Sequence, residues 1–146
     1  MHIQLGSFKL WHVPVRAATG GFILQSGIDK RSADEETAAG MHDLATITFP
    51  FFKRVTSNQF QKGLYRGEIA LGTALLIPVV PPLLAGSALT AFSSALLCMY
   101  WKTPGTHEKG ILWPTMQGMP LAENVWMLGI GISLVLDALA TKQRPL

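Results

Sequence analysis

The strongest restriction on this chain comes from residues 83–101, LLAGSALTAFSSALLCMYW, which contain no charged side chain. A helix needs about 20 apolar residues to cross about 30 Å of hydrocarbon, so this segment is long enough for a membrane span. Only 14% of the whole chain is charged, against about 25% in ordinary soluble domains. A chain with so few charges has too little polar surface to cover itself. The sequence therefore predicts an integral membrane protein.

Three further segments have the length and composition of spans, which gives the set 10–30, 64–80, 83–101 and 122–140. Prolines at 78–82 leave only a few residues between the second and third spans, and this predicts a tight helical hairpin. We therefore expect an all-α fold, a four-helix transmembrane bundle. It would form a single integral membrane domain over residues 1–146.

The first connection, residues 31–63, is long enough to hold structure of its own. The spacing from Ser32 to Glu35 is that of a capping box and predicts the start of a short helix. Residues 44–52, LATITFPFF, are apolar but too short to span. We expect a short amphipathic or interfacial segment here, which either lies in the interface with Lys53 and Arg54 toward headgroups or caps the bundle as a loop helix.

Small side chains recur on the predicted helices. Gly86, Thr90, Ser94 and Cys98 are four residues apart and predict one face on which helices can approach closely. Those residues could instead border a quinone or lipid cleft, but packing is the favoured interpretation. The full predicted packing face comprises Gly20, Gly27, Gly86, Thr90, Ser94, Cys98, Gly129 and Ser133.

Charged residues are costly within the predicted spans or at their rims, and four of them are candidates for pairing. In an up-and-down bundle Arg16 and Asp137 share a membrane side, and we predict that they pair. Lys30 and Glu68 meet at the other side by the same geometry. These residues either form neutralising ion pairs that fix helix order, or they line a polar pocket for a headgroup, a quinone carbonyl or a proton.

Signals for other chemistry are weak. The histidines lack the spacing of a helical metal pair, and Cys98 is the only cysteine, so we predict no metal and no intrinsic cofactor. A quinone stays possible as a bound cofactor. A net charge of +3 is too small and scattered for a nucleic-acid surface. No catalytic residue is identified.

The order and spacing of five residues resemble those of the DoxX family of small four-helix integral membrane proteins. The first predicted span carries the pattern R-x3-G-x6-G-x2-K, formed by Arg16, Gly20, Gly27 and Lys30, and Glu68 follows at the head of the second. The resemblance implies a multi-pass protein of the bacterial plasma membrane that is a partner of redox machinery, including thiosulfate:quinone oxidoreduction. Asp29, beside the lysine, departs from the family pattern.

These observations lead to three hypotheses for function. The first is a non-catalytic accessory or anchoring subunit of a quinone- or thiol-linked membrane redox complex, with the lipid bilayer and other redox subunits as partners. The second is a quinone-linked oxidoreductase component with its own ligand pocket. The third is a small transporter or lipid-handling protein. Substrate, partner identity, oligomeric state and orientation are left open by the sequence.

Overall fold

The computed structural model describes residues 9–142, so the expected domain of residues 1–146 includes two terminal stretches outside the described part. The described part is helical. Its elements are α1 (His12–Arg31), α2 (Glu35–Thr48), η1 (Pro50–Arg54), α3 (Ser57–Leu76), α4 (Pro82–Lys102), α5 (Met119–Ala122) and α6 (Asn124–Lys142).

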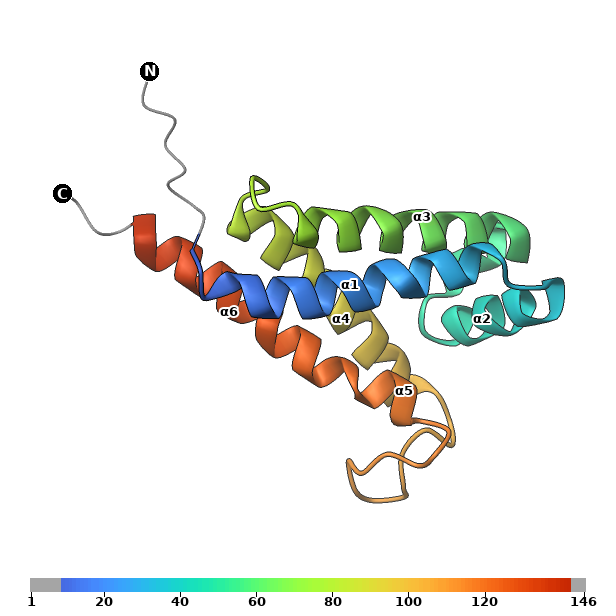
Figure 1. Ribbon diagram of the computed structural model, residues 1–146. Helices are drawn as coiled ribbons and strands as arrows, with labels where there is room; N and C mark the ends of the chain where they lie inside the picture. The colour runs from blue at the N-terminus through green and yellow to red at the C-terminus, as the bar shows by residue number, and fades with distance from the viewer. Residues whose placement is uncertain (1–8, 143–146) are drawn as a thin grey trace.

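The long helices form two pairs (Figure 1). α1 lies along α3, α4 packs against α6, and contacts between the pairs are fewer. The pairs meet where α1 and α4 begin and α3 and α6 end, and they diverge toward α2 and α5. Side chains of all four helices make a common core, which comprises Ile23, Leu71, Leu75, Ala85, Leu89, Met127 and Leu134.

Helix bounds differ most from expectation at α3, which begins at Ser57 and not near residue 64. Thr56 accepts a hydrogen bond from the Gln59 backbone N–H, and the Gln59 side chain accepts one from the Thr56 N–H. This capping box satisfies two N–H groups that a helix start leaves free. The helix therefore begins before its apolar stretch, because local hydrogen bonds and not hydropathy fix its first turn.

The connection after α1 holds a longer helix than expected. Asp34, and not Ser32, is the N-cap of α2, and its carboxylate accepts a hydrogen bond from the Thr37 N–H at 2.8 Å. The apolar segment 44–52 is divided between the end of α2 and η1, which begins at Pro50. Ala45 and Thr48 of this segment are buried, whereas Phe51 is exposed.

Glycines allow close approach within each helix pair. A Cβ on Gly72 of α3 would lie 2.6 Å from the Leu24 N of α1, and one on Gly20 would lie 2.9 Å from the Leu75 Cβ. In the other pair, a Cβ on Gly131 of α6 would lie 2.5 Å from the Thr90 Oγ1 of α4. Backbones at this separation exclude any larger residue.

Only some residues of the predicted packing face lie at these interfaces. Gly20, Gly27, Gly86 and Thr90 lie there, but Cys98 and Ser133 are exposed and a Cβ on Gly129 would meet nothing within 4 Å. Residues four apart advance by about 400°, so a strict four-residue stripe drifts about 40° per step. α6 instead buries Met127, Gly131 and Leu134, spaced by four and three.

Two helices of the described part are long and apolar enough to cross a membrane, by length and composition. They are Pro82–Lys102 and Met119–Lys142, and 33% and 22% of their most apolar windows are buried within the chain. α1 carries Arg16, Asp29 and Lys30, and this charge lowers its hydropathy. Spans at 10–30 and 64–80 stay predictions.

Candidate functional site

Arg16 caps the end of α3. Its guanidinium is buried and donates to four backbone carbonyls, those of Leu75 at 2.8 Å, Ala74 and Ile77 at 2.9 Å, and Val80 at 3.1 Å. The Ala74 carbonyl would ordinarily accept from residue 78, which is a proline and has no N–H. A planar guanidinium carries five donors and can satisfy several carbonyls together. Arg16 thus closes the turn between α3 and α4.

Asp137 joins α6 to the segment at the start of α1. Its carboxylate lies 2.9 Å from the His12 Nε2 and forms an ion pair with Lys9. Lys9 also donates to the Thr141 hydroxyl at 2.6 Å. His12 is buried, and it is among the residues that line two cavities of about 210 and 460 Å³.

The expected pairing of Arg16 with Asp137 is therefore replaced by two separate sets of contacts. Both residues do lie at the same end of the molecule, as the helix order required. The carbonyls at the end of α3 are nearer partners for the guanidinium. The missed partner His12 precedes Arg16 by four residues and so shares its helix face, a spacing that the sequence displays.

Lys30 and Glu68 lie together between α1 and α3. The Lys30 Nζ is 3.1 Å from the Glu68 carboxylate, and the Glu68 side chain is almost fully buried. The same Nζ also donates a hydrogen bond to the Ser26 hydroxyl at 2.5 Å. Gln61 donates to the Lys30 carbonyl at 2.8 Å. Gly27 makes room for this contact, because a Cβ there would lie 3.0 Å from the Glu68 Cβ.

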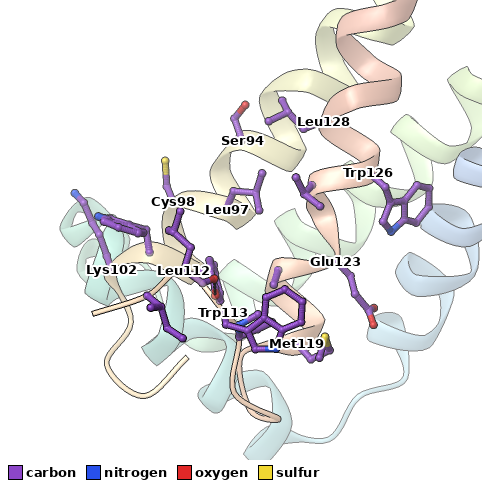
Figure 2. Close-up of a pocket in the computed structure, with 16 residues that line it drawn as sticks. Ser94, Leu97, Cys98, Lys102, Leu112, Trp113, Met119, Glu123, Trp126 and Leu128 are labelled. Carbon is purple, nitrogen blue, oxygen red and sulfur yellow. Dashed lines mark hydrogen bonds between the residues drawn. The ribbon is translucent and has the colours of Figure 1, made fainter. Parts of the chain in front are cut away.

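An apolar groove of about 1190 Å³ lies between α4, α6 and the connection that precedes α5. Figure 2 shows α4 contributing Ser94, Leu97 and Cys98, and α6 contributing Leu128. Trp113 and Met119 lie on the side of the connection. Lys102 and Glu123 are the charged residues among those that line it. Such a lining suits an aliphatic or isoprenoid chain.

The residues identified from the sequence thus fall into two groups, one that joins helices and one that lines the groove. The four charged residues hold helices together, and Ser94 and Cys98 face the groove or the surface. No cluster of three or more His, Cys, Asp or Glu side chains suited to a metal occurs within residues 9–142. Comparisons with known protein families, curated proteins and solved structures return no match for this chain.

Proposed function

We propose that this chain is an integral membrane protein in which α1, α3, α4 and α6 all span the bilayer. The observation that carries the proposal is the outward apolar surface of α4 and α6. Most of their apolar windows are not covered by the chain itself. A helix that is long enough to cross a membrane and exposes apolar side chains along its length requires hydrocarbon or another protein around it.

The role proposed within that membrane is a non-catalytic accessory or anchoring subunit of a redox complex. Arg16, Lys30, Glu68 and Asp137 are engaged in contacts that tie helices together. Charged side chains within membrane proteins pair with one another or with backbone carbonyls, and here each of these contacts joins neighbouring segments of the bundle. The redox association, the bacterial plasma membrane and a quinone as a cofactor of the complex come from the DoxX resemblance.

The groove between α4 and α6 favours a second candidate, a component that holds its own apolar ligand. Its volume of about 1190 Å³ accommodates a drug-sized or isoprenoid molecule. A quinone tail or a lipid chain fits its lining, whereas the charged cluster at Lys30 is closed by its own ion pair.

The first experiment asks whether the chain is integral to the membrane and what accompanies it. Membranes holding the tagged chain are washed with alkaline carbonate, and the retained protein is extracted in native lipid for mass spectrometry of proteins and small molecules. Retention together with stoichiometric redox subunits supports the accessory role. Release by carbonate contradicts the membrane proposal, and recovery of the chain without any redox subunit contradicts the accessory role.

A substitution pair separates the two candidates. Ser94→Phe fills the groove, whereas Ser87→Phe places the same side chain at an exposed position of α4. If the groove holds a quinone or lipid chain, Ser94→Phe abolishes its recovery and Ser87→Phe does not. Equal recovery from both variants contradicts the ligand-holding candidate.

A further inference from the structure

Residues 103–118, between α4 and α5, form a hairpin that is closed by backbone hydrogen bonds, here called the 103–118 hairpin. The Glu108 N–H donates to the Trp113 carbonyl and the Thr115 N–H to the Thr106 carbonyl, each at 3.0 Å. Gly110 makes the turn with a φ of 84°, a left-handed conformation that glycine adopts without steric cost. These bonds pair backbone groups that would be costly to leave free near hydrocarbon.

The tip of the hairpin presents large apolar side chains outward. Ile111 is 58% exposed, Leu112 67% and Trp113 71%. Adjacent large apolar side chains this exposed need a covering surface.

The hairpin is held against the end of α4 and extends past that end (Figure 1). The Tyr100 hydroxyl donates to the Leu112 carbonyl at 2.7 Å. Trp113 lines the same groove as Leu97, and Figure 2 shows both. Leu97 is five residues before the helix end at Lys102, about 7–8 Å at 1.5 Å per residue. The hairpin therefore lies at the same end of the molecule as the end of α4 and the start of α6, and Trp113 borders the groove between them.

We propose that the tip of the 103–118 hairpin inserts into the headgroup–acyl boundary of the bilayer and anchors the ends of α4 and α6 there. This inference rests on the proposed membrane location of those helices. Tryptophan favours that layer because its ring is apolar and its N–H is polar. Lys102 and Lys109 flank the tip and can extend to phosphates, while Glu108 and Glu123 are exposed and reach water.

The test uses the full chain with Trp113 as its single tryptophan, made by Trp11→Phe, Trp101→Phe and Trp126→Phe. It is reconstituted in phosphatidylcholine–phosphatidylglycerol vesicles whose acyl chains are brominated near the headgroup. We expect these lipids to reduce Trp113 emission roughly twofold, and aqueous iodide to have little effect. A carbonate wash before each measurement confirms retention of the chain.

Each result has a distinct meaning. Quenching of the retained chain by iodide and not by bromolipid overturns the anchor alone, because Trp113 then faces water. Quenching by neither also overturns it, because protein then covers the tip. Loss of the chain in carbonate overturns the proposed membrane location itself.

A second variant avoids the triple tryptophan replacement. Trp113→Cys in a Cys98→Ser background carries an environment-sensitive fluorophore, and Glu36→Cys in the same background is the matched control on an exposed turn of α2. We expect a blue-shifted, iodide-protected signal at 113 and an iodide-accessible one at 36. Equal iodide access at both positions overturns the anchor.

Discussion

Arg16 of α1 is a single side chain that binds the carbonyls at the end of α3. Replacing it with leucine removes donors from four carbonyls, two of which belong to the last turn of α3. Buried groups left without a partner cost about 1–3 kcal/mol each. We therefore expect Arg16→Leu to lower the free energy of unfolding by on the order of 3 kcal/mol, measured by SDS titration in mixed micelles with circular dichroism.

The matched variant is Arg16→Lys, which keeps the charge but not the planar set of donors. It should recover only part of the lost stability. An unfolding midpoint for Arg16→Leu equal to that of the unmodified chain would show that these carbonyls do not need the guanidinium.

Lys30 and Glu68 form the most deeply buried ion pair of the described part. Removing Lys30 leaves the buried Glu68 charge without a partner. We therefore expect Lys30→Met to lower the free energy of unfolding by on the order of 3 kcal/mol. The double variant Lys30→Met/Glu68→Gln should cost less than the sum of the single changes. Additive costs in the same SDS titration would argue against coupling between these side chains.

Asp34 gives a pH dependence at the start of α2. Hydrogen bonds from the side chain and backbone of Thr37 hold the Asp34 pKa below its ordinary value of 3.8. The carboxylate therefore stabilises the fold above that value, and its contribution disappears as the pH falls through the lowered pKa.

The measurement compares the melting temperature of the chain with that of Asp34→Asn between about pH 5 and 2. Asparagine also caps helices but has no charge to lose. We expect the advantage of aspartate to decline toward low pH. A difference that does not vary with pH would contradict this.

At the scale of elements, the α4–α6 crossing depends on the absence of a side chain at Gly131. Gly131→Ala would place a Cβ 2.5 Å from the Thr90 Oγ1, and such overpacking costs about 1–3 kcal/mol. Gly129→Ala, two residues away, meets open space and should be neutral or gain up to about 1 kcal/mol from helix propensity. Equal effects of the two changes on SDS unfolding would contradict the crossing.

At the scale of the whole molecule, the connections between the long helices lie at its two ends. If the helices cross a membrane as proposed, successive connections face opposite sides, and this can be tested. The turn between α3 and α4 lies at one end, and α2 and the 103–118 hairpin lie at the other. In a Cys98→Ser background, we expect Val79→Cys to react with a membrane-impermeant maleimide from one side, and Glu36→Cys and Glu108→Cys, at exposed positions, from the opposite side.

The two cysteines at 36 and 108 test different helices. Glu108→Cys on the side opposite to Val79→Cys reports that α4 crosses. Glu36→Cys on the side of Glu108→Cys agrees with crossing by α3 as well. Labelling of Glu36→Cys from the same side as Val79→Cys would contradict crossing by α3.

The sequence by itself determined that the fold is helical, because long uncharged runs and proline turns restrict a chain to helices of defined length. It placed α4 within one residue at each end, since Pro82 starts the helix and Lys102 ends its apolar run. It also brought Lys30 and Glu68 together, because consecutive antiparallel helices leave little choice of neighbour.

Only the tertiary structure decided the contacts that depend on exact helix rotation and on loops. Arg16 binds carbonyls at the end of α3 and in the following turn, and Asp137 contacts Lys9 and His12, because these short-range contacts depend on distance and direction. The buried face of α6 follows its crossing with α4, so Gly131 packs and Gly129 does not. Composition sets which residues avoid water, but the packing geometry sets which of them meet.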